Sequence, residues 1–498
     1  MGLRISNALV SYIKYLKNLF WPVDLAVYYP YPSMIPLWQV AGACVLLILI
    51  TLIALRLVNK QPYYLVGWLW FLGGLVPFLG LVQSGFWPEL ADRYAYLTSL
   101  GIFIALTWGV SNQLIRWKNS GKILVLGGTI AVLVLMVLSW RQVGFWKNSE
   151  TLFARAVSVT ENNYLAHYDL GLALFNRGEI DGAINQFRQA LSIKPDDIMV
   201  RNNLGVAMSR KNDIQGAIHQ YKEVINKDPY HYLAYFNLAQ AYTELRDFKS
   251  ASEWYQKGLN IAPNDVLARN SLGSLFLSSG DTDGAVAQFR ESLRINPHQA
   301  DVFCNLGKAY IMKGSYKKAE ESFQRAIQER PDHSEAQKGL KNVKTNQEQL
   351  MELTLSLNKM IEEDPDNIIL YIKLGQVYRQ QELYNKAIYQ YNKALAIKSD
   401  SIESMYGLVL TYSDIKDYSK ALDILDALRR IQPYNPEIDY NVACIYAKQN
   451  MAEESIRWLK QSLEKGFHKW ELIEKDPDLE NIRGTTLFNT FINEYKAN

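Results

Sequence analysis

The feature that most constrains this chain is a repeat of 34 residues, which begins at Tyr164 and keeps its phase through eight units. Leucine occupies the seventh place of every unit: Leu170, Leu204, Leu238, Leu272, Leu306, Leu340, Leu374 and Leu408. A period of this length is typical of stacked helical hairpins, each of which buries its apolar face against its neighbours. We therefore expect an all-α solenoid with these leucines on the buried face of each first helix.

Other places in the unit fit two helices that cross closely. The eighth place is small in most units, and the twentieth is alanine in seven: Ala183, Ala217, Ala251, Ala285, Ala319, Ala387 and Ala421. An aromatic ring occupies the twenty-fourth place in most units, and a proline then ends the second helix. This pattern closely resembles the tetratricopeptide-repeat (TPR) consensus, which implies a superhelical TPR solenoid of about nine hairpins over residues 164–467.

The sixth unit, 334–367, departs from the pattern. It keeps the length and the proline but carries Lys341 at the eighth place and Leu353 at the twentieth. Either the sequence has drifted within an unbroken stack, or the stack bends here between two subdomains. Beyond the repeats, residues 468–498 resemble the cap that closes many TPR arrays. Residues 148–163 look like a half-repeat that connects the array rigidly to the preceding segment.

The first 147 residues are far more apolar than the repeats. Four apolar stretches, at about 36–58, 63–83, 95–115 and 123–140, can each hold a membrane-crossing helix, which takes about 20 apolar residues. The last three carry no charged residue, and the first carries only Arg56, near its end. We predict a four-helix transmembrane bundle over residues 36–147. Residues 1–35 form a separate amphipathic segment, with apolar side chains every three or four positions from Ile5 to Phe20. This segment either lies along the membrane surface or packs on the bundle.

The charges between the predicted spans indicate an orientation. The loop with Arg56 and Lys60 and the loop from Arg116 to Lys122 are purely basic, whereas the loop between them carries both signs. Basic loops usually face the cytoplasm. With four spans, this multi-pass topology puts the repeat array on the extracytoplasmic side.

No motif in the sequence indicates a catalytic centre, a metal site or a cofactor. The net charge of +3 gives no electrostatic reason to expect nucleic acid as a partner. The six histidines lack metal-ligand spacing. Three Asp-x-Asp triplets fall between predicted helices, where aspartate caps the next helix.

One membrane-side motif resembles a known family. The run Ala91-Asp92-Arg93-Tyr94, with Phe20-Trp21-Pro22 upstream, is similar to O-mannosyltransferase-like membrane proteins that carry C-terminal TPR arrays. The resemblance covers roughly residues 1–160 and implies the last third of such a bundle, without the family's acidic catalytic residue. The chain alone is then expected to be inactive. Arg93 would bind the phosphate of a polyprenyl-phosphate sugar, or would pair locally with Asp92 or Glu89.

In TPR arrays, places two, five, six, nine and twelve of the unit line a concave groove. The candidate partner-binding residues at these places are Tyr168, Phe175, Asn202, Asn203, Phe236, Asn237, Asn270, Asn305, Tyr406 and Tyr440. Repeated asparagines can hydrogen-bond the backbone of an extended peptide, or they can simply form a solvated polar face.

Two functional hypotheses follow. The first is a membrane-anchored TPR scaffold that binds polypeptides outside the cytoplasm. The alternative is the C-terminal part of a polyprenyl-phosphate-dependent protein O-glycosyltransferase, whose catalytic half is missing from this chain.

Overall fold

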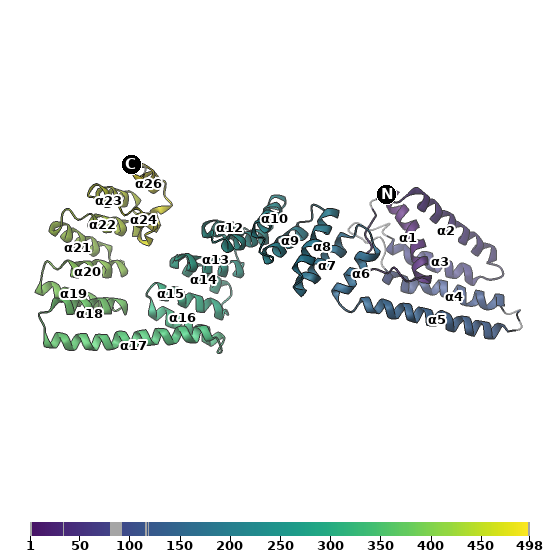
Figure 1. Cartoon of the computed structure of the whole chain (residues 1–498), viewed down its shortest axis with the longest axis horizontal. Coiled ribbons are helices and arrows are strands. Elements are labelled where there is room, and N and C mark those ends of the chain that lie inside the picture. The colour runs from purple at the N-terminus through teal and green to yellow at the C-terminus, as the bar shows by residue number, and fades with distance from the viewer. Residues whose placement is uncertain (1, 33, 80–91, 115–116, 118, 497–498) are drawn as a thin grey trace. The chain divides into compact units, whose positions relative to one another are not determined.

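The computed structural model describes residues 2–32, 34–79, 92–114, 117 and 119–496. All regular secondary structure within these ranges is helical. The chain forms two compact units, residues 1–263 and 264–498 (Figure 1). The predicted all-α architecture is confirmed.

The first unit begins with the apolar helices. They are α1 (Gly2–Phe20), α2 (Leu37–Leu57), α3 (Tyr63–Leu75), the 3-10 helices η1 (Val76–Phe78) and η2 (Asp92–Tyr94), α4 (Ala95–Leu114) and α5 (Ser120–Phe145). Three segments are long and apolar enough to cross a membrane: 37–57, 92–114 and 120–145. The predicted span 63–83 forms a shorter apolar helix at 63–78, and its end, from residue 80 on, lies outside the described residues. Three candidate spans are therefore found, and the fourth stays a prediction.

Two kinds of helix surface occur in this apolar segment. Helices α1 to α4 share a core that includes Tyr15, Trp68, Phe71 and Leu75. Helix α5, in contrast, buries none of its side chains. An all-round apolar helix normally lies in a large core or in a membrane, so the surface of α5 is unusual for a protein in water.

Helix α1 packs against the bundle along part of its surface. Leu9, Ile13 and Leu16 are partly buried against the bundle core, whereas Ile5 and Phe20 are 49% and 54% exposed. The packed-helix alternative therefore describes the middle of α1. A location of its exposed ends at a membrane surface stays a prediction.

The repeats follow helix α6 (Ser149–Val159) as eight hairpins. In the first unit they are α7 (Tyr164–Arg177) with α8 (Ile180–Ile193), α9 (Ile198–Arg210) with α10 (Ile214–Lys227), and α11 (Tyr232–Glu244) with α12 (Phe248–Ile261). In the second unit they are α13 (Val266–Ser279) with α14 (Thr282–Ile295), α15 (Ala300–Met312) with α16 (Tyr316–Glu329), α18 (Ile368–Gln380) with α19 (Tyr384–Ile397), α20 (Ile402–Asp414) with α21 (Tyr418–Ile431), and α22 (Pro436–Lys448) with α23 (Ala452–Glu464).

Close crossing and a tight turn define each hairpin. A Cβ atom on Gly273 would lie 2.6 Å from the ring of Phe289, so the fourth repeat leaves no room for a side chain at its eighth place. Between the helices, one residue adopts a left-handed backbone at the fifteenth place: Gly178, Asn212, Arg246, Gly280, Gly314, Glu382, Lys416 and Asn450. The predicted leucines at the seventh place are buried in seven units, and Leu340 is partly buried. The predicted repeat register is confirmed.

The sixth unit is not a hairpin. Residues Ser334–Glu363 form one continuous helix of 30 residues, α17 (Figure 1). Its first half packs on α15 and α16 around Val343, and its second half packs on α18 around Leu357. Neither of the two alternatives, sequence drift within an unbroken stack of hairpins or a bend between two subdomains, fully describes this arrangement. The single long helix α17 itself joins the repeats on either side.

The last segment closes the array. It contains α24 (Trp470–Lys475), η3 (Pro477–Leu479), α25 (Glu480–Arg483) and α26 (Thr486–Lys496). Phe467, Phe488 and Phe491 pack with α22 and α23 into one core. The role of this segment as a cap stays a prediction.

Candidate interaction surfaces

Asparagines on the first helices form hydrogen bonds between neighbouring repeats. The Asn203 Nδ2 donates to the Tyr168 hydroxyl at 2.9 Å, and the Asn237 Nδ2 donates to the Asn202 Oδ1 at 3.1 Å. These bonds link α7 to α9 and α9 to α11. Asn202 is only 8% exposed. The asparagines therefore stabilise the stacking of repeats, and their free hydrogen-bonding capacity is smaller than the sequence suggested.

Aromatic side chains lie beside this polar row. Phe175 packs against the core of the first repeats, and the guanidinium of Arg210 lies 5.0 Å from its ring centroid. The rings of Phe236 and Tyr255 stack at 6.3 Å, and Tyr232 meets Phe236 edge-on at 5.7 Å. Six predicted groove residues, from Tyr168 to Asn237, therefore lie on the row of first helices in the first compact unit, residues 1–263.

The same row exposes apolar side chains that the sequence analysis did not single out. Met199 and Leu233, at the second place of successive units, are 51% and 44% exposed. A single exposed aliphatic residue is ordinary on a protein surface, whereas a repeated one at a groove-lining place favours contact with a partner. The signal was present in the sequence, because the second place was among those expected to face a ligand.

The four predicted groove residues of the second compact unit, residues 264–498, have different environments. The Asn270 Nδ2 donates to the Gln299 Oε1 at 3.0 Å. Asn305 and Tyr406 are half-buried on α15 and α20. Tyr440 is only 5% exposed. Its hydroxyl donates to the Asp476 carboxylate at 2.6 Å, and its ring stacks on Phe467 at 4.4 Å, so Tyr440 belongs to the core of the cap rather than to a groove wall.

A second candidate surface is the loop between α1 and α2, which contacts the start of the repeats. We call residues 21–32 the junction loop. The Arg155 guanidinium of α6 donates to the Val23 carbonyl and lies 3.8 Å from the Asp24 carboxylate. The ring of Tyr28 lies nearly parallel to that of Phe153 at 6.3 Å. The junction loop thus lies directly against α6.

The junction loop also contacts the N-cap residue of α7 and the 3-10 helix η2, which precedes α4. The Asn163 Nδ2 donates to the Tyr28 carbonyl at 3.0 Å, while the Asn163 Oδ1 caps the first turn of α7. The Tyr29 hydroxyl donates to the Asp92 carboxylate at 2.8 Å. Burial, with the Asp92 charge beside it, raises the pKa of Tyr29 well above its ordinary value, so this phenol remains a donor. These contacts are consistent with a rigid connection between the apolar helices and the array, which stays a prediction.

Arg93 is exposed in η2, directly before α4. Its guanidinium lies 5.1 Å from the ring centroid of Tyr94, and its Nη2 donates to the Tyr94 hydroxyl at 3.4 Å. Asp92 instead accepts hydrogen bonds from Tyr29 and from the Asn18 Nδ2 at 3.2 Å. The expected local pair with Asp92 is thus replaced by contacts to Tyr94, and Glu89 lies outside the described residues.

Metal binding was not expected from the sequence. Across the described ranges, no cluster of three or more histidine, cysteine, aspartate or glutamate side chains is suited to hold a metal ion.

The stacked hairpins define a helical-repeat solenoid, a class of protein that binds other polypeptides. Sequence profiles identify the repeat: a TPR profile matches residues 171–212, and a tetratricopeptide-repeat profile matches residues 203–266. A third profile, described as the middle TPR-like domain of cilia and flagella-associated protein 70, matches residues 235–473. The array is a TPR array, and the chain is a TPR protein-interaction scaffold.

Two curated proteins are similar to parts of the chain. A chloroplastic protein from Arabidopsis thaliana is 29% identical over 89 residues, 17% of this chain and 27% of that protein. Protein O-mannosyl-transferase TMTC1 from Homo sapiens is 31% identical over 138 residues, 27% of this chain and 15% of that protein. The chain therefore spans 27% and 15% of the length of these two relatives.

Solved TPR structures overlap parts of the chain. A tetratricopeptide-repeat protein from Parabacteroides merdae shares 20% identity and has a TM-score of 0.35, covering 50% of this chain and 98% of that one. YrrB, described as a TPR protein with an unusual peptide-binding site, shares 23% identity and has a TM-score of 0.33, covering 38% of this chain and 97% of that one.

Proposed function

We propose that this chain is a membrane-anchored scaffold whose TPR groove binds polypeptide partners outside the cytoplasm. The observation that carries the proposal is the direct passage from α5 into the array. Helix α5 is apolar and has no buried side chain, and after three residues α6 begins the stack of repeats. A protein-binding surface is therefore built directly onto a helix suited to lipid.

The dimensions and aromatic residues of α5 support its place in a bilayer. Its 26 residues extend over about 39 Å, which exceeds the hydrocarbon thickness of about 30 Å. Trp140 and Trp146, near its repeat-side end, are 84% and 59% exposed, as is Trp117 at 62% just before its other end. Tryptophans commonly lie at the two membrane interfaces.

The contacts of the junction loop favour one topology. Because the loop touches α6, α7 and the start of α4, these segments lie on one side of the proposed bilayer. The basic residues Arg56, Lys60 and Lys122 then lie on the other side, where the cytoplasm is expected. In this arrangement the array is extracytoplasmic.

Cysteine accessibility tests this topology. Single Lys60→Cys and Lys211→Cys variants, both in a Cys44→Ser background, are treated in intact cells with a membrane-impermeant maleimide. We expect labelling of the Lys211→Cys variant and labelling of the Lys60→Cys variant only after permeabilisation. The reverse pattern contradicts an extracytoplasmic array.

Partner recovery tests the groove. Replacing Asn203, Asn237 and Asn305 together with alanine should reduce the recovery of polypeptide partners from native membranes about tenfold, because polar groups facing the partner are lost. Because Asn203 and Asn237 also bond to neighbouring repeats, thermal unfolding by circular dichroism verifies that the triple variant keeps its stack. The control replaces three exposed asparagines of second helices with alanine: Asn185, Asn226 and Asn260. Equal recovery by both triple variants argues against binding in the groove.

The second candidate function is the C-terminal part of a polyprenyl-phosphate-dependent protein O-glycosyltransferase. The similarity to a protein named O-mannosyl-transferase favours it. The exposed guanidinium of Arg93 also favours it, because two of its N–H groups can bind two oxygens of a lipid-linked phosphate. Catalysis would then depend on residues outside this chain. Crosslinking to a photoreactive polyprenyl phosphate should fall in Arg93→Gln but not in the matched Arg56→Gln variant. Equal crosslinking by both variants counts against this candidate.

A further inference from the structure

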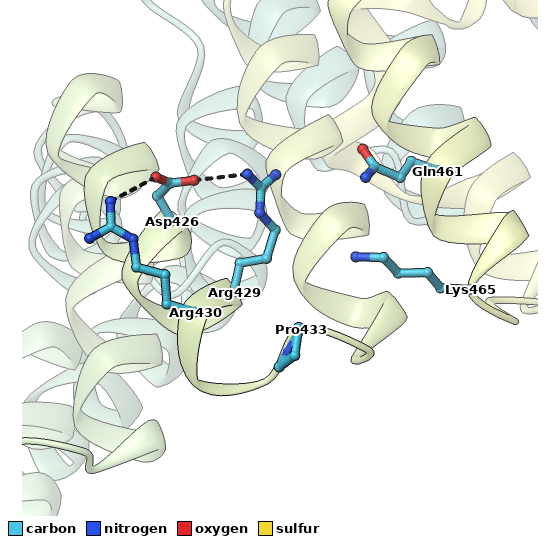
Figure 2. A pocket seen from close by; sticks show the side chains of 6 residues that line it. All are labelled: Asp426, Arg429, Arg430, Pro433, Gln461 and Lys465. Atoms are coloured by element: carbon cyan, nitrogen blue, oxygen red, sulfur yellow. Dashed lines mark ion pairs between the residues drawn. The ribbon is translucent and has the colours of Figure 1, made fainter.

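A basic cavity lies between α21 and α23, the second helices of the last two repeats. It is open to solvent, has a volume of about 340 Å³, and is lined by Asp426, Arg429, Arg430, Pro433, Gln461 and Lys465 (Figure 2). The cavity is formed by second helices, so it is separate from the row of first helices that forms the proposed groove.

Arg429 breaks the repeat pattern at this cavity. It stands at the twenty-eighth place of its unit, which is aliphatic in every other unit: Leu191, Ile225, Leu259, Leu293, Ile327, Ile361, Leu395 and Leu463. Those aliphatic side chains are buried or partly buried in the cores between repeats. A charged residue at a place that normally packs is a local departure of the kind that functional sites carry.

The guanidinium of Arg429 is held in place from two sides. It lies 4.8 Å from the ring centroid of Trp458 and 3.3 Å from the Asp426 carboxylate. The same carboxylate lies 3.6 Å from the Arg430 guanidinium (Figure 2). One carboxylate between two guanidinium groups leaves one positive charge unbalanced.

The facing wall adds polar groups but no net charge. Lys465 lies 2.6 Å from the carboxylate of Asp439, which is fully buried, so its charge is balanced within the protein. Gln461 brings a neutral amide from α23, and Pro433 has no backbone N–H to offer. The net positive charge of the cavity therefore belongs to the arginine pair.

Arginines at helix C-termini often serve only to offset the helix dipole. Arg294 is such a case, at the twenty-ninth place of its unit and 2.7 Å from Glu291. Arg430 occupies the same place in the eighth unit. Arg429 differs from both because it replaces a packing residue and faces a cavity.

We propose that this cavity binds an oxyanion, a phosphate or carboxylate group carried by a polypeptide. A guanidinium presents two parallel N–H groups that match the two oxygens of such a group. Arg429 is oriented by Trp458 and Asp426 before the ligand arrives, which lowers the entropy cost of binding. The amide of Gln461 supplies a further donor from the opposite helix.

The test uses the full chain purified in detergent at low ionic strength. Inorganic phosphate and a glutamate-rich peptide are titrated separately by calorimetry into the unmodified chain, Arg429→Leu and Arg294→Leu. Leucine is the residue that other units carry at the place of Arg429, so the stack should remain intact, which thermal unfolding by circular dichroism verifies. We expect saturable binding to the unmodified chain and to Arg294→Leu, and at least about tenfold weaker binding to Arg429→Leu.

Each outcome decides the proposal. Binding of phosphate alone, of the peptide alone or of both supports it and identifies the oxyanion, provided that Arg429→Leu weakens that binding. Absence of saturable binding for both probes overturns it. Equal affinity of Arg429→Leu and the unmodified chain also overturns it.

Discussion

The fifth and sixth repeats have the same length and the same proline at the thirty-second place, yet they fold differently. In the fifth, α15 and α16 form a hairpin that encloses Phe323. In the sixth, α17 runs straight for 30 residues. Some residues in the fifth repeat must therefore make the 34-residue unit fold back on itself, and the sixth repeat must lack them.

The residue at the turn, the fifteenth place of the unit, does not explain why one repeat folds back and the other does not. Glu382 stands at the fifteenth place of the seventh unit and adopts a left-handed backbone with φ 59. Glu348 stands at the same place of the sixth unit and is helical. The same residue type thus permits a turn in one unit and a helix in the other.

The crossing places do differ. The twentieth place is fully buried alanine in seven hairpins, such as Ala319 beside α15, whereas Leu353 is 45% exposed. At the eighth place, Gly307 lies under the ring of Phe323, whereas Lys341 is exposed. A hairpin in the sixth unit would have to bury a lysine and fit a leucine between two helices. The straight helix avoids both costs.

The largest effect should come from the buried leucine row shared by the hairpins. Leu272→Asp places an unpaired carboxylate at a fully buried position and should lower the free energy of unfolding by about 4 kcal/mol or more. Leu267→Asp on the same helix, where the side chain is 78% exposed, should change it by less than about 0.5 kcal/mol. Chemical denaturation followed at 222 nm measures both variants. Similar losses in the two variants would refute the register.

An intermediate effect should separate the eighth places of the two compared repeats. A Cβ atom on Gly307 would lie 2.7 Å from the Phe323 ring, so Gly307→Ala should destabilise by about 1–3 kcal/mol. Lys341→Ala should be neutral or slightly stabilising, because the site is exposed and alanine favours helix. The same denaturation experiment compares them. A neutral Gly307→Ala would mean that close crossing does not define the hairpin.

The smallest effect should differ in sign between two glutamates at the fifteenth place. Glu348→Gly should cost about 1 kcal/mol, because glycine weakens a helix interior. Glu382→Gly should be neutral or stabilising by up to about 1 kcal/mol, because it relieves a left-handed non-glycine residue. Unfolding free energies of the two variants provide the measurement. If both variants lose the same free energy of unfolding, the left-handed backbone at Glu382 does not favour glycine over the helical backbone at Glu348, and the explanation is wrong.

Most of the array could be predicted from the repeat period. The leucine at the seventh place recurs once per unit, and helical geometry then places it on the buried face of each first helix. The straight course of α17 was not predicted, although Lys341 and Leu353 were recognised as unusual. The sequence shows that a hairpin is disfavoured there, but not that an unbroken helix can pack on the repeats at both its ends. That outcome depends on tertiary contacts around Val343 and Leu357.

The interaction surfaces were predicted less completely. The places that line the groove followed from the consensus, but the bond between Asn202 and Asn237 depends on the spacing of neighbouring repeats. Tyr440 was predicted to line the groove from its fifth place in the repeat. Its contact with Asp476 could not be predicted, because the two residues are far apart in the sequence. Arg429 could have been found from the sequence, because it is the one charged residue at an otherwise aliphatic place.

The junction loop has a consequence for the proposed scaffold, because it fixes the first repeats close to the apolar helices. A flexible tether spreads a bound molecule through a volume that grows with tether length, and its effective concentration falls accordingly. Here the junction loop accepts hydrogen bonds from Arg155 of α6 and from Asn163 just before α7, and its Tyr29 donates to Asp92 of η2. In the proposed membrane arrangement, a polypeptide bound to the first repeats would be held at one distance and one angle from the bilayer. A change in that angle alone would then alter which of its residues reach the lipid surface.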